Sequence, residues 1–286
     1  MAVHVSSLTH SQMSPRGTNF AAARIDLREL EGFINPVVGL DHFRMRGPTF
    51  SPHPHAGFSA ISYLFEDSAG AMRNRDSLGH DFVAGPGDVI WTQAGCGVVH
   101  DEFPAENGRE VHGIQLFVNL SAANKQLNPK VFWVKRDDIP VAGDDSANRV
   151  RVVVGDYDGI CSPLMPAEAF QLLDGTWNVP GQLPLRGNWN TILYVLEGML
   201  QVDAAGKQIA LRRGDAVGLR SDAPALLHFM PQASTRMLVL AGPALTEPLV
   251  MHGPFIMNSV GELADAVARF NAGEMGRLQP VGAAQS

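Results

Sequence analysis

The segment AISYLFED at residues 60–67 decides the fold, because a weak copy of it returns later in the chain. YLFED at residues 63–67 resembles YVLEG at 194–198, an offset of 131 residues, and GDV at 87–89 resembles GDA at 214–216. Each copy is a β-rich run that stops at an acidic or glycine-containing turn. The repeat indicates two similar β units of about 130 residues each, which together fill the chain.

Other short runs also have the composition of strands, at residues 111–120, 149–154, 191–196, 199–202 and 237–240. Residues 111–120 alternate between apolar and other side chains, which is typical of a strand with one face in a core. Glu197-Gly198 separates two of these runs and predicts a hairpin between them. The 29 glycines and 19 prolines exceed the usual share. An all-β fold, a sandwich or a barrel, follows from this spacing of strands and turns.

One helix is predicted near the C-terminus, over residues 260–272. Ser259 and Glu262 have the spacing of a capping box, and Gly273 has the place of a C-terminal stop. An apolar stripe runs along the segment, formed by Val260, Leu263, Ala264, Val267 and Phe270.

The composition excludes several classes of protein. The net charge is −7 and no run of Lys or Arg occurs, so we expect binding neither to nucleic acid nor to an anionic membrane surface. Two cysteines cannot build a disulfide framework or a cysteine zinc site. No apolar stretch approaches the roughly 20 residues of a membrane span, and residues 1–20 lack the pattern of a secretory signal. We expect a cytoplasmic protein with a flexible N-terminal arm over residues 1–21.

Two histidine motifs carry the chemistry. His53 and His55 are two residues apart, and so are His100 and Glu102, so on strands each pair shares one face. If the two strands lie side by side, three imidazoles and one carboxylate converge on a site for one metal ion. Nitrogen and oxygen ligands suit Fe(II), Mn, Ni, Cu or Zn. The alternative is that these are histidines of turns or of the surface.

The chain resembles the pirin family of bicupins from about residue 22 to residue 277. The resemblance lies in five motifs: GLDHF at 39–43, HPHAGF at 53–58, PGDVIWTQAGCGVVHDE at 86–102, QLFVNL at 115–120 and GPFIMN at 253–258. It implies two stacked cupin (jelly-roll) β-barrels with a short C-terminal helix. We expect an N-terminal barrel with the metal site over residues 22–140. A second barrel without metal is expected over 141–286, including the helix 260–272.

The resemblance also implies a metal and an activity. The family's metal ligands carry over onto His53, His55, His100 and Glu102, and the usual family metal is iron. Some pirins open the flavonol quercetin with dioxygen, and others regulate a protein partner. We therefore expect a quercetin 2,3-dioxygenase-like oxygenase with one divalent metal ion per chain, Fe(II) first and Mn, Ni, Cu or Zn as alternatives. Its substrates are a small aromatic compound and dioxygen, and Glu102 is both ligand and general base. The alternative is a non-enzymatic, metal-dependent regulator that binds a protein partner.

Two departures from the family pattern limit what can be carried over. Many pirins have a glutamate four residues after the second histidine of the first motif, where this chain has Ser59. In the second barrel the positions aligned with His53 and His55 fall near residues 183–186, which contain no histidine, and His228 alone approaches the position of His100. We expect no metal there.

Overall fold

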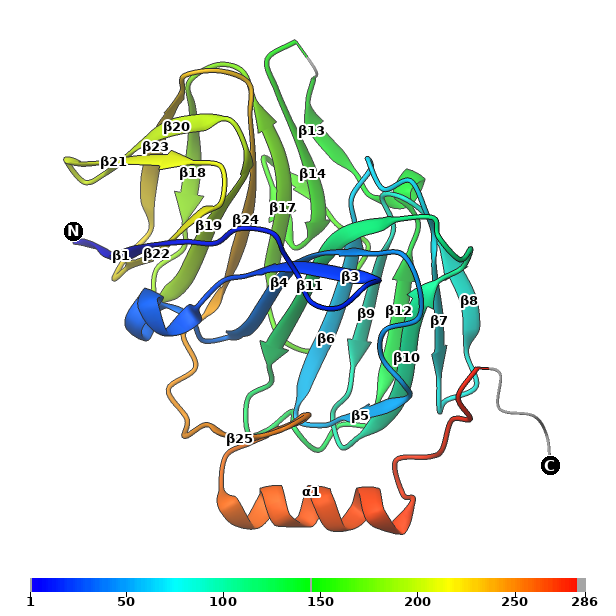
Figure 1. Ribbon diagram of the computed structural model, residues 1–286. Coiled ribbons are helices and arrows are strands. Elements are labelled where there is room, and N and C mark those ends of the chain that lie inside the picture. Colours follow the sequence, from blue (N-terminus) through cyan, green and yellow to red (C-terminus); the bar gives the residue numbers. More distant parts are fainter. Residues whose placement is uncertain (1, 145, 282–286) are drawn as a thin grey trace. The chain divides into compact units, whose positions relative to one another are not determined.

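The chain forms two compact units of β-sheet, which a computed structural model describes over residues 2–144 and 146–281, apart from the side chain of Glu31 (Figure 1). One unit, here called the histidine unit, comprises residues 13–22, 41–136 and the chain from 246 onward. The other, here called the leucine unit, comprises the chain up to residue 12, residues 23–40 and residues 137–245.

A seven-stranded and a four-stranded sheet make up the histidine unit. The order of the larger sheet is β12 (Lys130–Val134), β9 (Val89–Gln93), β6 (Phe58–Leu64), β11 (Val111–Asn119), β4 (Val37–Met45), β3 (Phe20–Arg24) and β2 (Ser14–Pro15). The order of the smaller sheet is β5 (His53–His55), β10 (Val98–Pro104), β7 (Met72–Asp76) and β8 (Asp81–Ala84). The unit also contains a two-stranded sheet of β25 (Val250–His252) and β26 (Phe255–Met257), followed by the helix α1 (Val260–Ala272).

The leucine unit repeats this plan. Its seven-stranded sheet has the order β1 (Val3–His10), β22 (Asp215–Ser221), β19 (Trp189–Glu197), β24 (Thr235–Pro243), β17 (Gln171–Trp177), β14 (Asn148–Val154) and β13 (Val141–Gly143). Its four-stranded sheet has the order β18 (Gly181–Leu185), β23 (Ala225–Pro231), β20 (Met199–Ala204) and β21 (Lys207–Arg212). The remaining elements are the hairpin β15 (Asp156–Tyr157) and β16 (Ile160–Cys161), and the 3-10 helices η1 (Leu27–Phe33) and η2 (Arg136–Asp138).

The sequence repeat marks equivalent strands of the two units. YLFED covers the end of β6, which lies between β9 and β11, and YVLEG covers the end of β19, which lies between β22 and β24. The prediction of an all-β fold with two cupin domains and one C-terminal helix is confirmed. The five runs predicted as strands from residue 111 onward are β11, β14, β19, β20 and β24.

The predicted hairpin at Glu197-Gly198 is wrong. β19 pairs with β22 and β24, whereas β20 pairs with β21 and β23 of the other sheet. The turn therefore carries the chain from one sheet to the next instead of folding it back on itself. Gly198 has a φ of +79°, and a Cβ there would lie 2.4 Å from the carbonyl oxygen of Ser234, so the corner requires glycine.

The N-terminal segment differs from the expected arm. Residues 3–10 form β1, which pairs antiparallel with β22 at the edge of the leucine unit's large sheet. Val5 lies opposite Leu219 and Leu8 opposite Val217, with a break in the register between the two pairs. The segment is therefore an outer strand of a sheet whose other strands lie within residues 137–245, where a flexible arm was expected.

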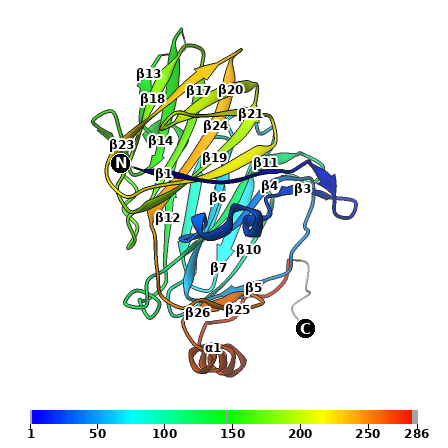
Figure 2. The ribbon, with the colours of Figure 1, turned by 90° about the vertical axis from the view of Figure 1, so that its left-hand side faces the viewer.

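Helix α1 has the predicted bounds, 260–272, and the predicted caps. The hydroxyl of Ser259 accepts from the backbone N–H of Glu262, and Gly273 ends the helix with a φ of 82°. The helix belongs to the histidine unit, however, and not to the second barrel as expected. Leu263, Ala266 and Phe270 pack with Ala56 and Val99, whereas the predicted Val260 and Ala264 are exposed. Figure 2 shows α1 end-on beside β25 and β26.

No helix in the described part of the chain has both the length and the apolar character needed to cross a membrane.

Candidate metal centre

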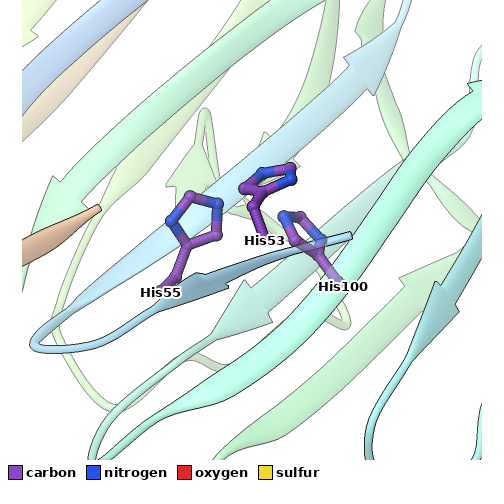
Figure 3. A group of neighbouring side chains, drawn as sticks. All are labelled: His53, His55 and His100. Carbon is purple, nitrogen blue, oxygen red and sulfur yellow. The ribbon is translucent and has the colours of Figure 1, made fainter. Parts of the chain in front are cut away.

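The pairing of β5 with β10 brings three histidines together. His53 lies directly opposite His100 in the register of the two strands, and His55 follows two residues later on the same face. The ring centroids of each pair among the three are 4.8 Å apart. One ligand nitrogen from each ring lies within 4.8 Å of the others, and Figure 3 shows the rings turned toward one another. This group, here called the histidine cluster, could hold a metal ion.

Two of the three imidazoles are buried, and each has at least one ring nitrogen without a hydrogen-bond partner in the described part of the chain. His55 is 4% exposed and His100 is 1% exposed. Over the described residues, Nδ1 of His55 and both ring nitrogens of His100 have no partner. Burial, with the neighbouring histidines, lowers the pKa of His55 to about 3 and lowers the pKa of His100 well below its ordinary value. Both rings are therefore neutral at neutral pH, which is the form that ligates a metal.

His53 has its tautomer set by the backbone. Its Nδ1 lies 2.9 Å from the carbonyl oxygen of Ser51, so the proton is on Nδ1 and Nε2 is free to ligate. Buried polar atoms without partners are costly in a folded protein. The orphaned nitrogens of His55 and His100 and the oriented ring of His53 fit a metal bound by imidazoles, and this chemistry suits several divalent transition metals.

A tight turn after His55 fixes the strand that carries the first two histidines. Gly57 has a φ of +83°, and a Cβ at this position would lie 1.9 Å from the carbonyl oxygen of Ile256. The buried ammonium group of Lys125 donates to the carbonyl oxygens of Gly57 and Ile256, at 2.8 and 3.0 Å, and to the side-chain oxygen of Asn119. Pro54, which has no backbone N–H to donate, lies on the outer strand of its sheet.

Glu102 lies near the histidine cluster in the chain but is not part of it. It follows His100 by two residues on the same face of β10, yet it is absent from the group of ligand atoms within 4.8 Å. Its Oε2 instead accepts a hydrogen bond from the hydroxyl of Ser62 at 2.8 Å. Burial raises the pKa of Glu102 to about 7, although the bond from Ser62 opposes this shift. A carboxyl group with this pKa can exchange a proton near neutral pH.

The Ser62 hydroxyl connects two interior strands to Glu102. It lies 2.6 Å from the side-chain oxygen of Gln115 and 2.8 Å from Glu102. A hydroxyl has one hydrogen, so it donates to one of these oxygens at a time, and when it donates to Gln115 it can accept only from the protonated form of Glu102. Ser62 thus relays hydrogen bonding between the amide of Gln115 and the carboxyl group of Glu102. The sequence analysis missed both residues, because neither lies in a histidine motif.

Asn74 is a third residue that no sequence motif marked. It lies directly opposite Glu102 in the pairing of β7 with β10 and is fully buried. The signal in the sequence is the alternation of β7, in which Met72, Asn74 and Asp76 are buried and the two arginines between them are less so. A polar side chain at an inward-facing position of a barrel strand is the feature that marks it.

Both departures from the family pattern, at Ser59 and in the second barrel, are visible in the structure. Ser59 is fully buried on β6, and by strand alternation it faces away from Ser62 and Glu102. In the leucine unit, β18 and β23 occupy the places of β5 and β10, and Leu183 lies opposite Leu227 where the histidine unit has His53 opposite His100. His228 is exposed on the other face of β23.

His42, which lies upstream of the first histidine motif in the sequence, contacts another histidine through its ring. Its Nε2 lies 2.8 Å from Nε2 of His112, whose Nδ1 is 3.0 Å from a carboxylate oxygen of Asp67. The two rings are stacked, with centroids 5.0 Å apart. This pair is separate from the histidine cluster.

Comparison with known proteins identifies relatives for both units. Residues 27–118 match the family described as Pirin, and residues 177–276 match the Pirin C-terminal cupin domain. Human Pirin is 32% identical over 255 residues, covering 85% of this chain and 83% of that protein.

Solved structures show the same fold. Quercetin 2,3-dioxygenase from Acinetobacter baumannii matches with a TM-score of 0.85 and 26% identity, covering 98% of this chain and 100% of that one. A bacterial pirin from Escherichia coli, described in complex with nickel(II), matches with a TM-score of 0.63 and 13% identity, covering 84% and 99%. At that identity the likeness shows the fold alone.

Proposed function

Because the chain belongs to the pirin family, we propose that it is a mononuclear metal-dependent dioxygenase of the quercetin 2,3-dioxygenase type, acting on flavonol-like compounds. The likeness to the A. baumannii quercetin 2,3-dioxygenase supports this choice among the functions of the family. The observation that carries the proposal is the histidine cluster, in which His55 and His100 are neutral, buried imidazoles with ring nitrogens that lack hydrogen-bond partners among the residues described.

In this proposal His53, His55 and His100 hold one divalent metal ion, and Glu102 is the fourth ligand. Fe(II) is the metal we expect first, with Mn, Ni, Cu and Zn as alternatives that nitrogen and oxygen ligands also accept. To reach the ion, the carboxyl group of Glu102 turns from its present partner, Ser62, toward the three imidazoles. Six-coordinate metals would keep two positions open for substrate and dioxygen.

When bound, the metal supplies Lewis acidity and brings substrate and dioxygen together. Glu102 takes the proton of the substrate's 3-hydroxyl group as general base. Burial raises its pKa to about 7 in the metal-free protein, so the carboxyl group can take up or release a proton near neutral pH. Burial of His55 and His100 keeps both imidazoles neutral throughout.

The experiment that tests the proposal combines metal analysis with oxygen uptake. Protein purified without chelator is analysed for bound metal, then stripped and reconstituted in turn with Fe(II), Mn, Ni and Cu. We expect quercetin-dependent oxygen consumption above the background of the metal salt for at least one ion. If none of the reconstituted forms consumes oxygen with quercetin, the oxygenase proposal is overturned.

The second candidate is a metal-dependent regulator that binds a protein partner. Two large apolar side chains favour it, since Leu226 is 52% exposed and Met230 is 58% exposed on the same face of β23 as His228. Exposed apolar groups gathered on one face are found at protein interaction sites. A regulator would bind metal at the histidine cluster without consuming dioxygen, so the oxygen-uptake experiment separates the two functions.

A further inference from the structure

Asn74 carries a hydrogen-bonding group with nothing to bond to. The side chain is 0% exposed, and neither its amide nitrogen nor its oxygen has a partner among the residues that the structure describes. A buried amide without partners is costly, because it has given up its bonds to water and gained none. Natural proteins contain few such groups, and each calls for an explanation, such as an ordered water or a ligand.

The strand register places this amide beside the proposed general base. Asn74 on β7 is the direct partner of Glu102 on β10, and directly opposed residues of antiparallel strands project from the same face of the sheet. That face points into the barrel, because the side chain of Glu102 reaches Ser62 on the other sheet. His100 lies two residues from Glu102 on the same face.

Asn74 has apolar neighbours on one side and polar neighbours on the other. On β7 its inward neighbour is Met72, which belongs to the apolar core that also contains Leu64 and Ile90. On β8 its partner is Phe82, which packs against this core. Asn74 therefore lies at the boundary between an apolar floor and the polar end of the barrel that contains the histidine cluster. A planar aromatic ligand with oxygen substituents needs both kinds of surroundings.

We propose that Asn74 is a specificity-determining residue of this barrel, whose carboxamide forms a hydrogen bond with the 3-hydroxyl or a catechol hydroxyl of a flavonol-like substrate. This inference rests on the proposed function. The amide has one acceptor and two donor hydrogens, so it can accept from a hydroxyl and donate to an oxo group of the same ligand. A site that leaves a buried group unpaired rejects compounds lacking the matching substituent.

The test crosses a change in the protein with a change in the ligand. Wild type and Asn74→Leu, both loaded with Zn(II) and kept under nitrogen so that no turnover occurs, are titrated with three compounds. These are quercetin, luteolin (which lacks only the 3-hydroxyl) and galangin (which lacks both catechol hydroxyls). We expect Asn74→Leu to weaken quercetin binding about 10–100-fold. One of the two analogues lacks the hydroxyl that Asn74 contacts, and its binding should weaken less than 3-fold.

Ser59→Ala is the matched control. It also removes a polar group that is fully buried and has no hydrogen-bond partner among the described positions, but one that faces away from Ser62. We expect it to bind all three compounds as wild type does. Thermal unfolding of the metal-free proteins gives a readout independent of ligand. Asn74→Leu should unfold at the same or a higher temperature than wild type, whereas a lower temperature would show a structural role and overturn the inference.

The outcomes also separate this inference from the proposed function. If Asn74→Leu binds all three compounds as wild type does, the amide is satisfied by water and the inference is overturned, while oxygen uptake by wild type still supports the function. If wild type binds quercetin through Asn74 but consumes no oxygen, the function falls and the inference stands. If wild type binds none of the three compounds, both are overturned.

Discussion

The ammonium group of Lys125 donates a hydrogen bond to the carbonyl oxygen of Gly57, two residues after His55, at 2.8 Å. The same group also bonds to the carbonyl oxygen of Ile256 at 3.0 Å, so it ties the histidine-bearing turn to β26. Lys125 is 2% exposed, and its bonds therefore lie in surroundings where water cannot replace them. The position of His55 thus depends on a lysine far from both histidine motifs.

Replacing this lysine should weaken metal binding. Lys125→Met keeps the length of the side chain but removes the ammonium donor from the oxygens of Gly57, Ile256 and Asn119. We expect the free energy of unfolding to fall by about 2–4 kcal/mol. Metal affinity should fall about 10-fold, as it does when other residues that support metal ligands are replaced. Metal titration and chemical denaturation measure the two effects. Lys135→Met, a change at an exposed lysine, is the control and should alter neither quantity. Unchanged affinity in Lys125→Met would contradict the supporting role.

Gly57→Ala should destabilise the protein far more than Gly79→Ala. Both glycines have a positive φ, +83° and +96°, so each substitution introduces backbone strain of about 1–2 kcal/mol. Only at Gly57 would the new Cβ lie 1.9 Å from a backbone oxygen, whereas at Gly79 no described atom lies within 4 Å. We expect Gly57→Ala to cost at least about 2 kcal/mol more than Gly79→Ala in denaturant unfolding. Equal costs would show that the turn can move away from Ile256.

Glu102→Gln separates the two roles proposed for this residue. Glutamine keeps the size and an oxygen donor but cannot accept a proton, and loss of a general base costs about 10²–10⁴ in rate. We expect quercetin turnover per bound metal to fall by that factor while metal content falls less. His53→Ala removes a proposed ligand and should lose metal and turnover together. Wild-type turnover per bound metal in Glu102→Gln would exclude the general base, even in a working oxygenase.

The metal-free protein should lose stability as the pH falls below 6.5. In the unfolded chain His55 and His100 take up protons near their ordinary pKa of 6.5, whereas in the folded protein burial lowers the pKa of His55 to about 3 and that of His100 well below 6.5. Above pH 6.5 both histidines are neutral in the folded and in the unfolded protein, so they do not change the free energy of unfolding. Below it the unfolded state binds more protons at these two sites, so each histidine lowers the free energy of unfolding by about 1.4 kcal/mol per pH unit. Glu102, whose pKa burial raises to about 7, opposes the effect of one histidine over this range, and the net slope is about that of one histidine.

Urea unfolding of the metal-free protein between pH 7 and pH 5 measures this slope. His100→Leu should reduce it by the share of one histidine, whereas His228→Gln, a change at an exposed histidine, should leave it unchanged. Identical slopes in wild type and His100→Leu would contradict the pKa shift of His100.

Local patterns predicted most of the strands and the three histidines of the cluster. β11 and α1 follow their alternation and caps, and the two-residue spacing of His53 and His55 needs only a strand to bring both to one face. The strand pairing of β5 with β10 then brings His100 to them. The place of Glu102 outside the cluster was not predictable, because it depends on a hydrogen bond to Ser62, forty residues away in sequence.

Pairing over long distances was also not predictable. Residues 3–10 have a polar, mixed composition, which does not predict that they pair with β22. The turn at Glu197-Gly198 has the local chemistry of a hairpin, and only the full sheet shows that it crosses between sheets. Asn74 and Lys125 act through neighbours on other strands, so no local motif marks them.

The division of the chain between the two units has a consequence for how the protein is made. β1 is synthesised some two hundred residues before its partner β22. The histidine unit in turn lacks α1 and β26 until the last segment has emerged. The two sheets of the histidine unit lie within residues 14–134, whereas the large sheet of the leucine unit is complete only once β24 has been translated. No single cut divides the chain into the two units, and the leucine unit must complete its fold late in synthesis.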